Sequence, residues 1–133
     1  MFDTVLIAGL GLMGGSMAKT IKARTLSRVL GWNRTRATAE QALADGSIDA
    51  IATEALYKEA DLVIIGLYPQ ATVDWLLENM PKMKKGCVIV DMVGVKQFMV
   101  DHLEQAALDA GVHYVGGHPM AGTQFSGFKY AKA

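Results

Sequence analysis

The feature that most constrains the fold is the glycine-rich segment Gly9-Leu-Gly-Leu-Met-Gly14, which directly follows the apolar run Thr4–Ala8. This spacing between a strand and a helix is typical of a dinucleotide-binding turn. The first glycine permits a tight turn, the second lets the backbone approach a pyrophosphate, and the third lets the helix pack closely on the strand. Free N–H groups at the helix start then bind the phosphates. We therefore predict a dinucleotide site, with a glycine turn that binds no ligand as the alternative. The predicted contacts are Gly9, Leu10, Gly11, Leu12, Met13 and Gly14.

Short apolar runs alternate with amphipathic segments along the rest of the chain. The runs predict strands at Thr4–Ala8, Arg28–Trp32, Ile48–Thr53, Asp61–Leu67, Cys87–Asp91 and Val112–Val115. The segments between them predict helices at Gly14–Ala23, from a cap at Thr35 to a stop at Gly46, at Ala71–Met80 and at Lys96–Ala110. Such alternation specifies parallel strands joined by right-handed crossovers. The predicted fold class is α/β: a doubly wound, mainly parallel Rossmann-type sheet with helices on both faces, in one domain over residues 1–133.

The residues after the second predicted strand bear on the choice of cofactor. Domains that bind NAD usually place Asp or Glu there to hold the ribose hydroxyls, whereas this chain has Asn33-Arg34-Thr35. A neutral amide removes a charge that would repel a 2′-phosphate, and Arg34 can pair with that phosphate. These three residues are therefore predicted cofactor contacts, with NADP favoured over NAD. The alternatives are a solvated Arg34 and capping of the next helix by Asn33 or Thr35.

Loops that follow other predicted strands lie where open α/β sheets bind ligands. Leu67 and Tyr68 follow the most apolar strand, where the ribose or nicotinamide would pass, although Tyr68 could equally pack on the surface. His118 follows the last strand, within Gly116-Gly-His-Pro-Met-Ala-Gly122. It is a candidate general base, because histidine titrates near neutral pH and the flanking glycines permit close approach. Asp91 ends another predicted strand and could orient a neighbouring group, but an ordinary cap or loop contact is expected.

Composition argues against several classes of protein. The 13 basic and 13 acidic residues give zero net charge, so no long-range attraction for nucleic acid or an anionic membrane is expected. The single cysteine, Cys87, lies in an apolar run and is predicted to be a small buried hydrophobe. With no disulfide partner, no signal-like start and no apolar run of roughly 18 residues, the chain is expected to be soluble and cytoplasmic. No residue cluster has metal-ligand spacing, so no metal is expected.

Several segments together carry a specific resemblance. Gly9–Ser16, with Gly117-His-Pro-Met-Ala-Gly122 and Ser126-Gly127, resembles the N-terminal nucleotide-binding domain of the prephenate and arogenate dehydrogenase family. The segment Asp91-Met-Val-Gly-Val-Lys96 is similar to the loop after the fifth strand in that family. The likeness runs through essentially the whole chain, and its most selective part is the His-Pro-Met-Ala-Gly segment.

The resemblance implies an oxidative decarboxylation of prephenate to 4-hydroxyphenylpyruvate with NAD(P)⁺, in tyrosine biosynthesis. His118 would accept a hydrogen bond from the ring hydroxyl and take its proton. Gly94, Lys96 and Ser126 are the candidate positions on the substrate side, and Lys96 could also be a solvated residue at a helix start. Gly94 departs from the family, whose members often carry a serine there. A relative that uses arogenate would share every one of these motifs.

The resemblance also implies a second domain, because the family continues into a helical region that dimerises and supplies cations for the substrate carboxylates. We therefore expect a homodimeric full-length protein and no activity from this chain alone. Two other interpretations compete. One is an NADP enzyme like the β-hydroxyacid dehydrogenases and imine reductases, which share the glycine turn and often the Asn-Arg-Thr segment. The other is a non-catalytic, redox-sensing nucleotide-binding module.

Overall fold

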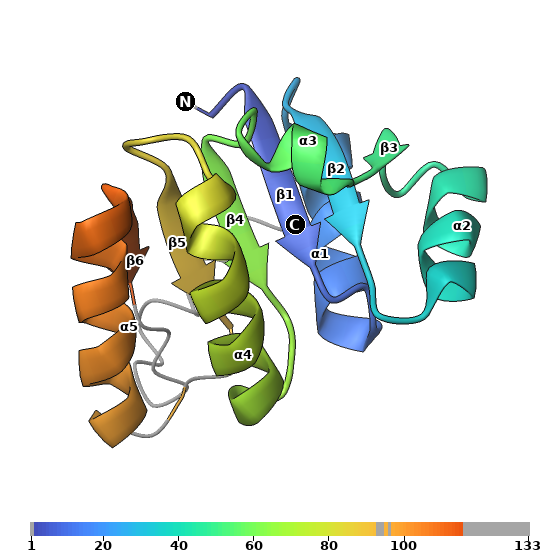
Figure 1. Ribbon diagram of the computed structural model, residues 1–133. Coiled ribbons are helices and arrows are strands. Elements are labelled where there is room, and N and C mark those ends of the chain that lie inside the picture. The colour runs from blue at the N-terminus through green and yellow to red at the C-terminus, as the bar shows by residue number, and fades with distance from the viewer. Residues whose placement is uncertain (1, 93–94, 96, 116–133) are drawn as a thin grey trace.

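A single parallel sheet organises the computed structural model, which describes residues 2–92, 95 and 97–115 (Figure 1). Six strands lie in the order β3-β2-β1-β4-β5-β6, and every neighbouring pair is parallel. The order reverses between β1 and β4, which is the switch point where such sheets bind ligands. The strands are β1 Thr4–Ala8, β2 Arg28–Trp32, β3 Ala50–Ile51, β4 Leu62–Ile65, β5 Val88–Asp91 and β6 His113–Val115. The predicted doubly wound fold is confirmed.

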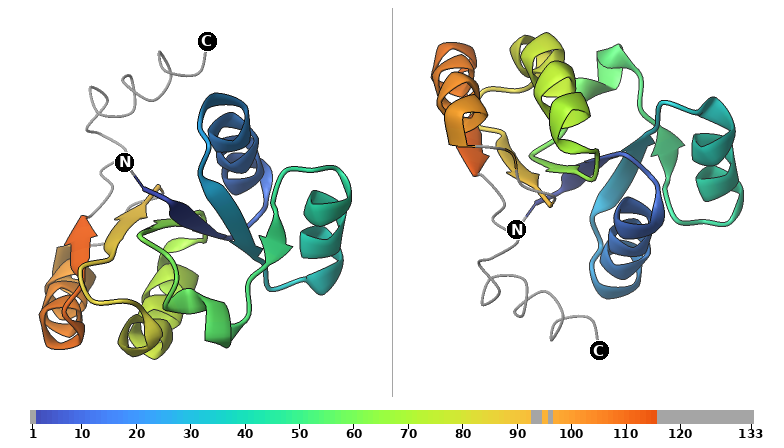
Figure 2. Two further views of the ribbon diagram at one scale, coloured as in Figure 1. Left: turned by 90° about the horizontal axis from the view of Figure 1, so that it is seen from above. Right: turned by 90° about the horizontal axis from the view of Figure 1, so that it is seen from below.

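Helices cover both faces of the sheet (Figure 2). One face carries α1 Leu12–Arg24 and α2 Arg36–Ala44. The other carries α3 Glu54–Tyr57, α4 Pro69–Asn79, the 3₁₀ turn η1 Met80–Lys82 and α5 Gln97–Ala110. Within the described ranges, no helix combines the length and apolar character needed to cross a membrane.

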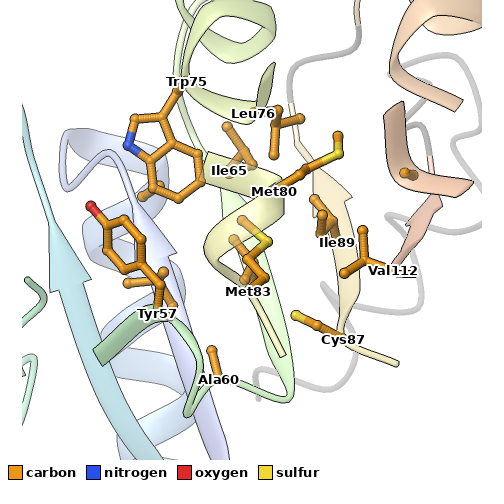
Figure 3. Packing of buried hydrophobic residues seen from close by; sticks show 14 of the residues in the cluster. Tyr57, Ala60, Ile65, Trp75, Leu76, Met80, Met83, Cys87, Ile89 and Val112 are labelled. Atoms are coloured by element: carbon orange, nitrogen blue, oxygen red, sulfur yellow. The ribbon is translucent and has the colours of Figure 1, made fainter. Parts of the chain in front are cut away.

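The core is divided by the sheet into two layers, because side chains along a strand alternate between its faces. Val5 and Ile7 of β1 join the layer under α1 and α2, whereas Leu6 and Ala8 join the layer under α4 and α5. Figure 3 shows the second layer. Cys87 is fully buried in it, and burial raises the pKa of its thiol to about 11. The prediction that Cys87 is a buried hydrophobe is confirmed.

Both ends of α4 differ from the predicted ones. The strand predicted to reach Leu67 ends at Ile65, and α4 begins at Pro69, two residues before the predicted start at Ala71. The first turn of a helix tolerates proline, because the N–H that proline lacks has no partner within the helix there. Helix α4 ends at Asn79, and Pro81 lies inside the 3₁₀ turn that follows.

Other boundaries differ by a few residues. Helix α1 begins at Leu12, so Gly14 lies within its first turn and does not open it. The third strand is shorter than predicted, with two residues where Ile48–Thr53 was expected, and the four-residue α3 after it was not predicted. Leu43 of α2 and Leu77 of α4 are 42% and 46% exposed although each lies next to a buried residue, so the buried faces of these two helices are narrow.

Candidate functional site

The three glycines of the turn after β1 play different structural parts. Gly9 has a φ of +96°, and a Cβ there would lie 2.7 Å from the carbonyl oxygen of Gly66. A Cβ on Gly14 would lie 1.7 Å from the carbonyl oxygen of Gly9, so α1 can approach β1 only without a side chain at this position. Gly11 has no atom within 4 Å of the place where its Cβ would be. Gly9 and Gly14 are therefore required by packing, whereas Gly11 faces open space.

The start of α1 presents unpaired backbone donors. Gly11 is the N-cap residue, no side chain caps the helix, and its first turn contains no acidic residue. The N–H of Gly15 bonds to the carbonyl oxygen of Gly11 at 2.7 Å, while the N–H groups before it have no acceptor within the helix. Such an end has the positive pole of the helix dipole, which favours an anion.

Asn33 ties the glycine turn to the loop after β2. Its Oδ1 accepts a hydrogen bond from the N–H of Leu10 at 2.8 Å, and its Nδ2 donates to the carbonyl oxygen of Thr35 at 3.1 Å. Thr35 is the N-cap residue of α2, but its hydroxyl makes no capping hydrogen bond, so side-chain capping by Thr35 is wrong. Arg34 is exposed, and no described residue pairs with its guanidinium group.

The turn after β4 lies against the glycine turn. The side chain of Leu67 would touch a Cβ on Gly9, and the carbonyl oxygen of Leu67 accepts a hydrogen bond from the Thr72 hydroxyl at 3.0 Å. Tyr68 is the N-cap residue of α4 and is 85% exposed. Its ring therefore does not pack on the described surface, contrary to one of the two interpretations of this tyrosine.

A buried polar pair near the same edge was missed by the sequence analysis. Asp91, opposite Ile65 at the end of β5, is fully buried, and its carboxylate accepts a hydrogen bond from the Tyr114 hydroxyl of β6. Burial and this hydrogen bond raise the pKa of Tyr114 above its usual range. This bond between neighbouring strands goes beyond the cap or loop contact that was expected for Asp91. A carboxylate at the end of an otherwise apolar strand was the available signal.

The remaining predicted site residues lie outside the part of the chain that the structure describes. These are the candidate base His118 and the three candidate substrate-side positions Gly94, Lys96 and Ser126.

Sequence comparisons identify the family of the chain. Residues 17–133 match the family model described as the prephenate dehydrogenase nucleotide-binding domain. The chain belongs to this family. It is 39% identical to the prephenate dehydrogenase of Bacillus subtilis (strain 168) over 136 aligned residues, which cover 99% of this chain and 36% of that protein. The chain thus spans about a third of the length of the curated relatives that it matches.

Solved structures of this family and of a neighbouring class of enzymes both match the fold of this chain. The prephenate dehydrogenase of Aquifex aeolicus, in complex with hydroxyphenyl propionate and NAD⁺, matches with a TM-score of 0.77 and 26% identity, over 92% of this chain and 43% of that one. An imine reductase from Myxococcus stipitatus, in complex with NADP⁺, matches with a TM-score of 0.70 and 24% identity, over 84% of this chain and 39% of that one. The second likeness shows a shared fold alone, so the imine reductase interpretation is the weaker match.

Proposed function

We propose that this chain binds NAD(P) at the start of α1 and forms the cofactor-binding domain of a prephenate dehydrogenase. The observation that carries this proposal is the uncapped N-terminus of α1 beside the open space at Gly11. A pyrophosphate suits a helix end that offers free N–H groups and the positive end of a dipole. When bound, the oxidised nicotinamide supplies the hydride acceptor.

The proposal gives each predicted contact residue a role in binding the cofactor. Backbone groups of Leu10–Gly14 would hold the pyrophosphate. The Oδ1 of Asn33 already accepts one hydrogen bond from the Leu10 N–H, and its second lone pair can accept another from a ribose hydroxyl. Arg34 is exposed at the same loop and would pair with a 2′-phosphate, which favours NADP over NAD. Leu67 and the exposed Tyr68 would line the path toward the nicotinamide.

The substrate follows from family membership. We propose that the protein containing this domain converts prephenate to 4-hydroxyphenylpyruvate, with arogenate as the alternative substrate. His118 would take the proton of the ring hydroxyl while hydride leaves the same ring carbon, and the ring becomes aromatic as carbon dioxide is lost. Gly94, Lys96 and Ser126 would lie on the substrate side. The extra length of the relatives fits a further substrate-binding domain in a homodimeric, cytoplasmic enzyme.

Calorimetric titration of the folded 133-residue chain with NADH and with NADPH tests cofactor binding. We expect saturable binding of both, tighter for NADPH, and no detectable binding of either at millimolar concentration would overturn the proposal. The activity is tested in a longer protein that contains this chain, by assaying prephenate and arogenate. Replacement of His118 by Asn should lower turnover about 10²- to 10⁴-fold with little change in cofactor affinity. Cofactor binding without turnover of either substrate would favour the sensing module.

A further inference from the structure

The last residue of β5 places a buried carboxylate level with the residue that precedes the glycine turn. The register of the sheet aligns Ala8 of β1 with Ile65 of β4, and Ile65 with Asp91 of β5. These three strands end at one edge of the sheet (Figure 1). Neighbouring strands lie about 4.8 Å apart, so the backbone of Asp91 is roughly 10 Å from that of Ala8, on the side of β1 away from β2.

Stability alone does not account for a charge at this position. Asp91 is fully buried at the end of an otherwise apolar strand, and its carboxylate accepts a hydrogen bond from the Tyr114 hydroxyl. Taking a carboxylate out of water is costly, and apolar residues of similar volume often replace buried ionic groups without loss of stability. The carboxylate therefore calls for a role that an apolar side chain could not fill.

A buried carboxylate acts on its surroundings over several ångströms, because little water lies around it to screen the charge. Tyr114 shows this effect within the domain. Burial first, then the hydrogen bond to Asp91 and then the charge of Asp91 raise the pKa of the Tyr114 phenol above its usual range. Two unit charges about 10 Å apart still interact appreciably at the effective dielectric constant of a protein. A charge that appears or disappears on a ligand at this edge would therefore respond to Asp91.

The proposed function determines which end of the cofactor lies near Asp91. It places a ribose at Asn33, after β2, and the pyrophosphate at the start of α1, after β1. A dinucleotide spans the crevice at the switch point of the sheet. Its nicotinamide half therefore continues from β1 toward the ends of β4 and β5. The nicotinamide ring is positively charged in the oxidised cofactor and neutral in the reduced one.

We propose that the buried carboxylate of Asp91 makes this domain favour the oxidised cofactor over the reduced one. The inference rests on the proposed function and adds the residue that distinguishes the two redox states. Such a preference suits a dehydrogenase, because the oxidised form is its reactant and the reduced form must leave.

The test is calorimetric titration of the folded 133-residue chain with NAD⁺ and with NADH, from which the ratio of the two affinities is taken. Asp91→Asn keeps the shape and an acceptor oxygen but loses the charge. It should lower the preference for NAD⁺ over NADH about three- to tenfold, mainly through weaker NAD⁺ binding. Two controls should leave the ratio unchanged. Tyr114→Phe removes the hydrogen bond and keeps the Asp91 charge, and Asp61→Asn removes a carboxylate from the opposite edge of the sheet.

The outcomes separate this inference from the proposed function. If Asp91→Asn weakens both redox forms alike, or leaves the ratio within about twofold of the unchanged chain, Asp91 only supports the fold and the cofactor proposal stands. If the folded, unchanged chain binds neither form, both proposals fall. If Asp91→Asn does not fold by circular dichroism, the double variant Asp91→Leu/Tyr114→Phe replaces the pair by apolar groups. An unchanged ratio in that variant overturns the inference.

Discussion

The two edges of the sheet differ in whether carboxylate side chains accept hydrogen bonds from the backbone N–H groups. At the amino edge, where the strands begin, aspartates close the ends of the strands. Asp61 accepts hydrogen bonds from the N–H groups of Asp3 and Thr4, at 3.1 and 3.0 Å, and pairs with Lys84. Asp49 accepts from the N–H of Val29 at 2.8 Å and from Lys22 at 2.5 Å.

At the carboxyl edge, the start of α1 has neither a side-chain cap nor an acidic residue in its first turn. The glycines there remove side chains that would otherwise occupy the space. The difference teaches that the fold satisfies donors with its own carboxylates where only stability is at stake. At the start of α1, where an anion would bind, no side chain of the fold caps the donors.

The largest effect is expected at Gly14. Gly14→Ala would place a Cβ 1.7 Å from the backbone oxygen of Gly9. This clash can be relieved only if α1 moves away from β1. We expect a loss of at least about 3 kcal/mol in the free energy of unfolding, measured by urea denaturation. Gly15→Ala is the matched control, because its Cβ would meet the Leu10 oxygen at an ordinary 3.4 Å. This variant should be about 0.5–1 kcal/mol more stable. Equal stability of the two variants would contradict the packing argument.

Gly11 should separate binding from folding. Gly11→Val places its side chain in open space and suits the extended backbone at this position. Because valine is a poorer N-cap residue than glycine, we expect the free energy of unfolding to fall by about 1 kcal/mol at most. NADPH affinity should fall at least about tenfold, or ~1.4 kcal/mol, because the new side chain occupies the approach to the N–H groups of α1. Calorimetry and urea denaturation on the same sample check both, and unchanged affinity would place the pyrophosphate elsewhere.

A substitution of Asp61 tests how much its carboxylate stabilises the amino edge of the sheet. Asp61→Asn keeps an acceptor oxygen but loses the charge, and should lower the free energy of unfolding by about 1 kcal/mol at pH 7 without altering NADPH affinity. Hydrogen bonds from Lys84 and Thr4 hold the carboxyl pKa of Asp61 below its usual value. A lowered pKa stabilises the fold above the unfolded value near 3.9, and that stabilisation is lost as the pH falls through the folded pKa.

The pH series for this pair of proteins runs from 7 down to 2 by urea denaturation. The difference between the unchanged chain and Asp61→Asn should shrink below about pH 4. A difference that stays constant over this range would mean that the charge of Asp61 adds nothing to the closure of the amino edge.

The smallest effect is expected at Arg34. Its side chain is exposed, so a pair with a 2′-phosphate is screened by water and worth about 1 kcal/mol or less. Arg34→Ala should therefore weaken NADPH binding by up to about fivefold and leave NADH binding unchanged. The control is Arg36→Ala, because Arg36 is already paired with Glu40 at 3.4 Å across one helix turn. If both variants lower NADPH affinity alike, the loop attracts the phosphate only through its overall charge.

Local signals in the sequence were enough to predict the first two strands and the turn between β1 and α1. Strands β1 and β2 have the predicted bounds, because apolar runs flanked by a glycine turn and by polar residues leave little freedom. The parts predicted for Gly9 and Gly14 in the glycine turn are confirmed, whereas the approach of a pyrophosphate at Gly11 stays a prediction. The start of α4 was missed because proline ends strands and also opens helices. Helix α3, with four residues, is too short to show a helical period.

Contacts between distant residues could not be predicted in this way. Asp61 bonds to residues 57 and 58 positions earlier, and Tyr114 reaches Asp91 from the neighbouring strand. Such pairs depend on the order and register of the strands, which the propensities of nearby residues do not determine. Among the described residues, the buried indole N–H of Trp75 has no hydrogen-bond partner, and this too follows from its packing and not from its place in α4.

The double hydrogen bond of Asn33 limits how cofactor preference can be redesigned. The obvious exchange, Asn33→Asp, would install the carboxylate that NAD-binding domains use. It would also remove the donor that holds the Thr35 carbonyl oxygen at 3.1 Å and set two acceptors against each other. Selectivity and loop geometry are thus coupled in one side chain. A successful redesign, or a natural drift toward NAD, must supply a new donor for Thr35 in the same step.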